Sequence, residues 1–298
     1  MSSSITVKPI TLDDKELLNS YFMNNCTLNS EFTFTNLFMW RKSYNICYTI
    51  IDDMLCIIHK HGDEPMAVTY PLGNGNVKFV IQKLLAYFKE IGEKPLIRLY
   101  CEDSVSELQA AFPDTFVFTE DEDSHDYVYR TNDLINLSGN KYHSKKNHVN
   151  RFKSTYSYEY HTMTPKYRDM CLEMFNKWCE TKTGIEEQHE AVSELLSNWE
   201  LLNITGGCIT VDGEMVAFSF GEPLCSNNKI AVIHLEHANT DYTGSFATIN
   251  QQFLENEWSD FEYVNREEDM GIEGLRKAKQ SYHPAFMVKK YIATLKHF

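Results

Sequence analysis

The order in which predicted helices and strands follow one another repeats once along this chain of 298 residues. Segments whose apolar residues alternate are expected to form strands, and segments whose apolar residues recur every three or four positions are expected to form helices. In each half the predicted order is strand, helix, helix, three strands, helix, strand, helix and strand. The repeat lies in this order and not in the letters, so we expect two domains of one α/β fold, each with helices packed on a mixed sheet.

Short motifs support several of these elements. Asp52-Asp53 and Asp212-Gly213 each separate two apolar runs, as the turn of a hairpin does. The aromatic-rich segment EFTFTNLFMWRKSYN predicts a buried helix. We interpret FVFTE and YVYRT as the closing strand pair of the first half, and AFMVKKYI as the single last strand of the second half.

This order of elements resembles the GNAT acyltransferase fold, here twice in tandem. We place the N-terminal domain at residues 1–133, a basic connecting segment at 134–157, and the C-terminal domain at 158–298. In the GNAT fold the fourth strand and the helix after it diverge from the fifth strand, and the acyl donor lies in the resulting V. The resemblance therefore implies a cleft in the C-terminal domain, with donor phosphates at a helix N-terminus.

The segment HANTDYTGSFATINQQF stands where the resemblance places the phosphate-binding loop. Backbone N–H groups at the start of a helix favour phosphate, and glycine allows a close approach. The usual Gln/Arg-x-x-Gly-x-Gly/Ala pattern is reduced here to Gly244 and Ala247. Two interpretations stay open: Gly244 and Ser245 contact a phosphate, or Ser245 only caps the helix.

Composition narrows the class of protein. The formal charge of -14 argues against a protein that covers nucleic acid with its whole surface, although it allows a local basic patch. The eight cysteines are scattered without a C-x-x-C pair, and no apolar run approaches the roughly 20 residues that span a bilayer. We expect a reduced, cytoplasmic protein, free or at the membrane surface, with no metal or redox cofactor.

The segment NKYHSKKNHVNRFK is the most basic part of the chain, and no acid occurs from Leu134 to Tyr158. On a helix, Lys141 and Lys145 share one face, whereas the neighbouring Lys146 points about 100° away from Lys145. One interpretation is a solvated linker helix that pairs with surplus carboxylates. The other is contact with the phosphates of a nucleotide, tRNA or lipid head group. The candidate phosphate contacts are Lys141, Lys145, Lys146 and Arg151.

The segment NREEDMGIEGLRKAKQSYHP places acids before a predicted helix and cations within it. This polarity complements the helix dipole, which is one interpretation. The other is that ionisable groups gather directly after the strand FEYVN because that strand borders the expected cleft. On this second interpretation the candidate substrate or phosphate contacts are Asn265, Glu267, Glu268, Asp269, Arg276 and Lys279.

Three residues are candidates for proton transfer. Tyr282 resembles the tyrosine that donates a proton to the leaving group late in the last helix of GNAT enzymes, although a core tyrosine would show the same pattern. His234 and Glu236 lie on one face of a predicted strand, two residues apart. Either could accept a proton from an attacking amine, and either could be structural.

Taken together, the segments EFTFTNLFMWRKSYN, KYHSKKNHVNRFK and VNREEDMGIEGLRKAKQSYHP resemble the C-terminal domain family of phosphatidylglycerol lysyltransferase and, more distantly, the Fem peptidyltransferases. The resemblance implies a tandem GNAT-like fold and aminoacyl transfer from charged tRNA to an amino or hydroxyl group of a lipid. The full lysyltransferases carry a multi-span membrane half that is not predicted here, so a small soluble acceptor or docking at a membrane surface are alternatives.

Two other functions remain open from the sequence. One is an N-acyltransferase that uses acyl-CoA as donor and a small amine as acceptor. The other is a non-catalytic module that retains only anion recognition. Acyl-CoA binding would distinguish the first, because a ligand that binds only the folded state raises its melting temperature. If the Tyr282→Phe variant kept every measurable property of the wild type, the non-catalytic module would be indicated.

Overall fold

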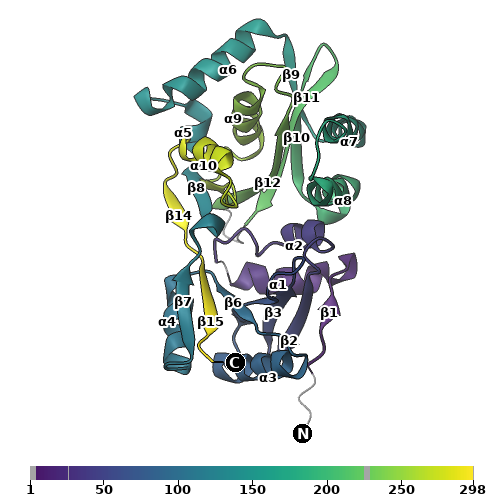
Figure 1. Cartoon of the computed structure of the whole chain (residues 1–298). Coiled ribbons are helices and arrows are strands. Elements are labelled where there is room, and N and C mark those ends of the chain that lie inside the picture. The colour runs from purple at the N-terminus through teal and green to yellow at the C-terminus, as the bar shows by residue number, and fades with distance from the viewer. Residues whose placement is uncertain (1–4, 26, 225–228, 298) are drawn as a thin grey trace. The chain divides into compact units, whose positions relative to one another are not determined.

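A computed structural model describes residues 5–25, 27–224 and 229–297, and the chain divides into two compact units (Figure 1). Unit 1 comprises Met1–His125 together with Val288–Phe298, and unit 2 comprises Asp126–Met287. Each unit is built on its own mixed sheet, against which helices pack. This arrangement confirms the predicted fold class, a mixed α/β structure that occurs twice.

The sheet of unit 1 has the strand order β1-β2-β3-β4-β6-β15-β7, with β5 paired to β3. Strands β4 and β6 run parallel, and the other pairs run antiparallel. The strands are β1 (Lys8–Pro9), β2 (Cys47–Ile51), β3 (Met54–His59), β4 (Ala67–Thr69), β5 (Leu72–Gly73), β6 (Leu96–Leu99), β7 (Phe116–Glu120) and β15 (Tyr291–Leu295). The helices are η1 (Leu12–Asp14), α1 (Lys15–Asn24), α2 (Phe34–Trp40), α3 (Val77–Glu90), α4 (Glu102–Ala111) and η2 (Glu122–Ser124).

The sheet of unit 2 has the order β14-β8-β13-β12-β11-β10-β9, and β12 runs parallel to β13. In Figure 1, α9 covers one face of this sheet, while α7 and α8 cover the other. The strands are β8 (Asp126–Arg130), β9 (Tyr158–Thr162), β10 (Thr205–Val211), β11 (Glu214–Pro223), β12 (Ile230–Ala238), β13 (Tyr263–Asn265) and β14 (Phe286–Val288). The helices are α5 (Thr131–Asn136), η3 (Asn140–Tyr142), α6 (His143–Thr155), α7 (Pro165–Cys179), α8 (Glu186–Leu202), α9 (Ser245–Glu257) and α10 (Glu273–Gln280).

The two sheets have the same strand order when read from opposite ends, and each contains one strand supplied by the other half of the sequence. β15, the last strand of the chain, lies between β6 and β7 of unit 1. β8, which follows β7 directly in sequence, lies between β13 and β14 of unit 2. The tandem repeat is therefore completed by an exchange of strands between the two halves.

This exchange corrects two sequence predictions. FVFTE and YVYRT do not form a closing pair, because β7 and β8 belong to different sheets. AFMVKKYI is not one strand, because β14 joins the sheet of unit 2 and β15 joins that of unit 1. The compact units also differ from the predicted domains 1–133 and 158–298: the basic segment 134–157 lies within unit 2, and the C-terminal strand lies in unit 1.

The helices that shape unit 2 are amphipathic, and their apolar residues form its core. Helix α9 buries Ile249 and Phe253 against the sheet, and α6 buries Val149 and Phe152 beside them. Burying each such phenylalanine contributes about 2–3 kcal/mol. Packing of α6 on α9 therefore places the basic segment in a fixed position within the unit. Among the described residues, no helix is long and apolar enough to cross a bilayer.

Candidate functional site

The parallel strands β12 and β13 separate after a short register. Their pairing ends with Val232 opposite Asn265, yet β12 stays paired to β11 as far as Ala238. We call the region between Ile233–Ala238 and Arg266–Asp269 the strand fork. It is the divergence that the sequence analysis expected in the second half, and the side chains of both branches meet there.

Tyr282 lies at the strand fork, and two cations lie over its ring. The Lys145 ammonium lies 4.1 Å from the ring centroid, and the Arg266 guanidinium lies 4.9 Å from it. The Tyr129 ring packs edge-on at 6.4 Å. Only 7% of Tyr282 is exposed, and this burial raises the pKa of its hydroxyl to about 12, although the Arg266 charge opposes the rise. The phenol therefore stays protonated at neutral pH, as a proton donor must.

Glu236 connects the two branches of the strand fork. One carboxylate oxygen accepts a hydrogen bond from Arg266 Nη2 at 3.0 Å, and the other accepts one from Asn250 on α9 at 3.1 Å. The side chains of Glu236 and Arg266 are each 13% exposed. Charge-assisted hydrogen bonds of this kind hold both side chains in one orientation. Glu236 is close enough to Tyr282 for its charge to raise the pKa of the phenol.

His234, two residues before Glu236, is held between two carboxylates. Nδ1 lies 2.8 Å from Glu267 and Nε2 lies 2.9 Å from Glu222, and the imidazole is fully buried. Burial alone would lower the pKa of His234, but the hydrogen bonds and charges of Glu222 and Glu267 raise it to about 9. At neutral pH both ring nitrogens therefore carry protons and donate. In this arrangement neither ring nitrogen has a lone pair that could accept a proton from a substrate.

The acid Asp269, in the loop after β13, has its partners on α10, on β8 and in the loop itself. Asp269, 1% exposed, accepts hydrogen bonds from Nε and Nη2 of Arg276 at 2.8 and 2.9 Å and from the Tyr127 hydroxyl at 2.5 Å. Asp269 Oδ1, which accepts from Arg276 Nη2, also accepts a hydrogen bond from the backbone N–H of Gly271. The opposite charges around α10 therefore fold the loop onto the helix, and Asp269 and Arg276 are occupied with each other.

The remaining candidates of this segment also have partners in the structure. Lys279 donates to the backbone carbonyls of Arg266 and Glu267. Asn265 is fully buried, donates to Asp126 and accepts the backbone N–H of Glu267. Glu268 is partly exposed. These contacts fix the backbone that carries Arg266 into the strand fork.

The basic segment forms η3 and α6 and presents its cations on two sides. Lys145 is half-buried and faces Tyr282. Lys146, Arg151 and Lys153 are exposed, and within the described chain no acid lies at ion-pair distance from them. Lys141 is exposed and lies 3.7 Å from Asp133. The segment is therefore a solvated helix whose outward charges are mostly not neutralised by the protein, with one lysine turned inward.

The structure gives Gly244 a packing role. Its φ is +92°, and a Cβ there would lie 2.3 Å from the backbone carbonyl oxygen of His148 on α6. Ser245 is 2% exposed and donates its hydroxyl to the carbonyl of Asn239 instead of capping α9. Helix α6 thus covers the start of α9, the place at which one of the two sequence interpretations puts a phosphate.

Sequence reasoning missed Arg266 and Asn250, which complete the cluster around Glu236 and Tyr282. Arg266 follows directly on the strand FEYVN, so its position at the end of a parallel strand was a usable signal. Asn250 gave no such signal, because its role depends on the face that α9 turns to β12.

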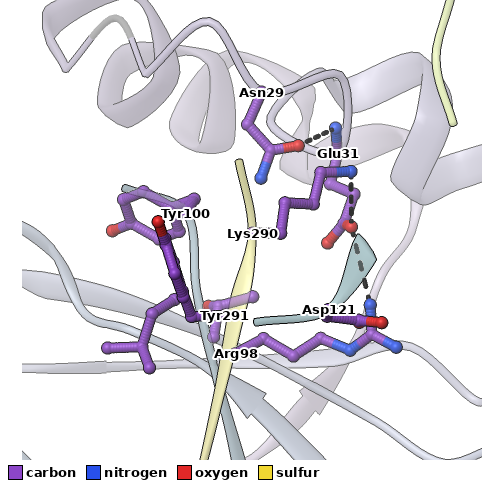
Figure 2. A pocket seen from close by; sticks show the side chains of 9 residues that line it. Asn29, Glu31, Arg98, Tyr100, Asp121, Lys290 and Tyr291 are labelled. Atoms are coloured by element: carbon purple, nitrogen blue, oxygen red, sulfur yellow. Dashed lines mark hydrogen bonds and ion pairs between the residues drawn. The ribbon is translucent and has the colours of Figure 1, made fainter. Parts of the chain in front are cut away.

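Unit 1 has the equivalent strand pair, but there the space is closed. The register of β4 and β6 ends with Thr69 opposite Arg98, and the Tyr100 hydroxyl donates to the carbonyl of Tyr70 at 3.0 Å. Beside it, Glu31 lies between Lys290 at 3.1 Å and Arg98 at 3.6 Å (Figure 2). These residues line a cavity of about 10 Å³, the room that a single water requires. A donor molecule cannot enter there. The fork of unit 2 is the candidate site because Tyr282 and Glu236, both predicted from the sequence, lie close together in it.

The two sheets share one strand order, each contains a strand from the other half of the sequence, and the parallel pair of unit 2 diverges beside Tyr282. These features define the class: a tandem GNAT-like transferase fold. The particular family follows from the sequence. Residues 27–294 match the model of the phosphatidylglycerol lysyltransferase C-terminal family, and the chain belongs to that family. The predicted resemblance is thereby confirmed.

Several solved structures share the fold of this chain. A conserved protein of unknown function from Bacteroides thetaiotaomicron VPI-5482 is 37% identical, with a TM-score of 0.91 over 98% of this chain and 100% of that chain. L-PGS from Bacillus licheniformis shares the fold at 16% identity, with a TM-score of 0.66 over 98% and 93% of the two chains. FemX shares it at 8% identity, with a TM-score of 0.60 over 98% and 97%. A tandem GNAT protein from the clavulanic acid biosynthesis pathway shares it at 6% identity, with a TM-score of 0.51 over 99% of each.

One curated relative is an uncharacterized protein, MYCGA3080, from Mycoplasmoides gallisepticum (strain R(low / passage 15 / clone 2)). It is 25% identical over 182 residues, which are 57% of this chain and 56% of the relative. The match thus spans about half the length of that protein.

Proposed function

We propose that this protein transfers an aminoacyl group from a charged tRNA to an amino or hydroxyl group of a lipid or small molecule. One observation carries the proposal: helix α6 faces solvent with the unneutralised cations Lys146, Arg151 and Lys153 and faces Tyr282 with Lys145. A polyanion bound to the outer side of α6 would place its reactive end near the strand fork. The family assignment supports a transferase in general terms.

The outward side of α6 has the chemistry of a phosphate-binding surface. The chain has a net charge of -14, so its surface as a whole repels a polyanion. A polyanion can bind only where cations without acidic partners are clustered, and the outer side of α6 is such a cluster. Binding would rest on phosphate contacts and release of counterions, so it would weaken steeply as salt rises. Such contacts position a tRNA without reading its sequence.

The chemistry at the strand fork would use Tyr282 and Glu236. The acceptor nitrogen or oxygen forms a bond to the carbonyl carbon of the aminoacyl ester, and the bond from that carbon to the ribose oxygen breaks. Tyr282 supplies the proton that the departing ribose oxygen takes, and Glu236 is the carboxylate placed to receive the proton of the acceptor. Solvent then restores both groups. His234 holds Glu267, and with it the loop that carries Arg266, so we assign it a positioning role.

The structure favours a tRNA donor over acyl-CoA at one point. Coenzyme A would need the exposed N-terminus of α9 for its pyrophosphate. Here the backbone of His148 lies against Gly244, and Ser245 is buried. An acyl-CoA therefore lacks the anion site on which this class of fold relies.

The test is binding of charged tRNA to the full chain across a salt series. The triple variant Lys146→Glu/Arg151→Glu/Lys153→Glu should lose most of the affinity and flatten the slope of log affinity against log salt by about 2–3, since each lost phosphate contact removes about 0.7–0.9. A matched control is Lys78→Glu/Lys83→Glu/Lys89→Glu on α3, which changes the net charge equally. Equal loss in both variants, or no binding by the wild type, would refute the proposal.

A further inference from the structure

We propose that Arg266 and Lys145 form an anchoring site for a single oxyanion, a phosphate or a carboxylate group of a substrate, beside Tyr282. The inference deepens the proposed function, on which its assignment to the transfer site rests. It names two side chains as direct ligands of the substrate and is separate from the polyanion surface on the outer side of α6.

Arg266 has a buried donor without an acceptor. Its side chain is 13% exposed, gives Nη2 to Glu236 and interacts with the Tyr282 hydroxyl, whereas Nη1 is buried with no acceptor at hydrogen-bond distance in the described part of the chain. Buried polar atoms in folded proteins are almost always satisfied, so an unsatisfied N–H marks a place for a water, an ion or a ligand. The guanidinium is always charged, and a pair of its N–H groups matches the oxygens of a carboxylate or phosphate.

Lys145 is a half-buried cation without a carboxylate partner. Its ammonium lies 4.1 Å from the Tyr282 ring centroid, and no acid among the described residues comes within ion-pair distance of it. Burial lowers the pKa of Lys145, and the nearby Arg266 charge lowers it further, while Glu236 opposes both. An arriving anion would relieve the repulsion between the two cations, because it would be attracted by both.

The charge balance around Tyr282 favours an anion. Arg266 and Lys145 contribute two positive charges, and Glu236 offsets one of them. Lys279, which also faces this region, gives its ammonium to backbone carbonyls. A guanidinium and an ammonium offer only donors, so the complementary group is an acceptor with negative charge and not a cation or an apolar chain.

Both ligands also contact the proposed proton donor. Arg266 and Lys145 lie at 4.9 and 4.1 Å from the ring centroid of Tyr282. An oxyanion held by them would fix the substrate next to the phenol that supplies a proton. The oxyanion could belong to the nucleic-acid backbone of the donor or to the head group of a phospholipid acceptor, since both present a phosphodiester.

The experiment is isothermal titration of the full-length protein with inorganic phosphate and with acetate at low salt. We expect saturable binding that weakens about tenfold or more in Lys145→Gln and in Arg266→Gln, since each variant removes a charge-assisted contact. Lys89→Gln on α3, an exposed lysine outside unit 2, should bind within about twofold of the wild type. Lys145→Gln removes one half-buried ammonium over the Tyr282 ring and no buried ion pair, so it remains informative if Arg266→Gln fails to fold.

Two further arms identify the source of the oxyanion. A dinucleotide ending in adenosine represents the donor, and glycerophosphoglycerol represents the head group. If the affinity for either probe falls in Lys145→Gln, the result supports the site and identifies which of the two sources supplies the oxyanion. Absence of saturable binding by every probe, or identical affinities in wild type and both variants, overturns the inference.

The outcomes also separate this inference from the proposed function. Loss of tRNA binding with intact, Lys145-dependent phosphate binding would refute only the proposed donor. Salt-sensitive tRNA binding with no contribution from Lys145 or Arg266 to any small oxyanion would refute only the anchoring site.

Discussion

The carboxylate of Asp269 and the guanidinium of Arg276 face one another through two parallel hydrogen bonds of 2.8 and 2.9 Å. This pair joins the loop after β13 to helix α10 while the carboxylate is almost fully buried. The acids at the head of the helix and the cations within it therefore serve the architecture of the strand fork. They place Arg266 and Tyr282, the two residues that we propose face a substrate.

Asp269→Asn should destabilise the protein by about 2 kcal/mol or more, because it leaves the Arg276 guanidinium without its counter-charge and removes a bidentate pair. Chemical denaturation at neutral pH measures the change. Lys277→Gln breaks only the exposed pair with Glu273 and should change stability by less than about 0.5 kcal/mol. A loss in Lys277→Gln as large as that in Asp269→Asn would contradict the role assigned to the loop.

The clamp around His234 should lose its stabilising effect in alkali. Burial opposes the charged form, but the two carboxylates raise the pKa of His234 from 6.5 to about 9. A raised pKa stabilises the fold fully below the unfolded value and ceases to do so as the pH rises through about 9. The wild type should exceed His234→Gln in unfolding free energy by on the order of 2 kcal/mol at pH 6, with the gap closing toward pH 10. A gap that does not depend on pH would show that the imidazole is neutral.

The ion cluster of Figure 2 should respond to acid in the opposite sense. Burial alone would raise the pKa of Glu31, but the charges of Lys290 and Arg98 lower it to about 2. A lowered pKa stabilises the fold above the unfolded value and stops doing so as the pH falls through about 2. Glu31→Gln should cost about 3 kcal/mol at pH 7, with a smaller difference from wild type at pH 3. Glu93→Gln is the control, because its pair with Lys60 is one-third exposed and contributes about 0–1 kcal/mol.

Tyr282→Phe should reduce transfer by about 100-fold or more while leaving stability almost unchanged. The phenyl ring keeps the contacts with Lys145, Arg266 and Tyr129, so the change removes only the hydroxyl, with its proton and its interaction with Arg266. Single-turnover release of the aminoacyl group from charged tRNA measures the first effect, and thermal unfolding measures the second. Full activity of the phenylalanine variant would remove Tyr282 from the mechanism.

Two glycines of unit 2 provide a matched test of the packing between α6 and α9. Gly244→Ala should cost at least about 2 kcal/mol, because its φ of +92° is strained for alanine and the new Cβ meets the His148 carbonyl oxygen. Gly274→Ala should be neutral or stabilise by up to about 1 kcal/mol, since no atom lies within 4 Å of its Cβ position. If Gly244→Ala is as stable as wild type, α6 is not held against α9 as described.

The sequence was sufficient for the type and order of the elements, because apolar periodicity is local. It also predicted that Lys145 and Lys146 diverge, which the half-buried and exposed positions of the two side chains confirm. The sheet to which β8 and β15 belong was out of reach, since pairing is decided by strands far away in the chain. The partners of Asp269 and Glu267 were equally hidden, because an acid at a helix start can serve a dipole, a ligand or a buried cation.

The position of β15 has a consequence for biosynthesis. Because β15 pairs with both β6 and β7, the sheet of unit 1 lacks an internal strand until this segment has been translated. Tyr291–Leu295 are translated after every other described strand, so the sheet of unit 1 is completed only after the residues of unit 2 have been made. A nascent chain stalled before residue 291 would expose two unsatisfied strand edges and become a substrate for chaperones or for aggregation.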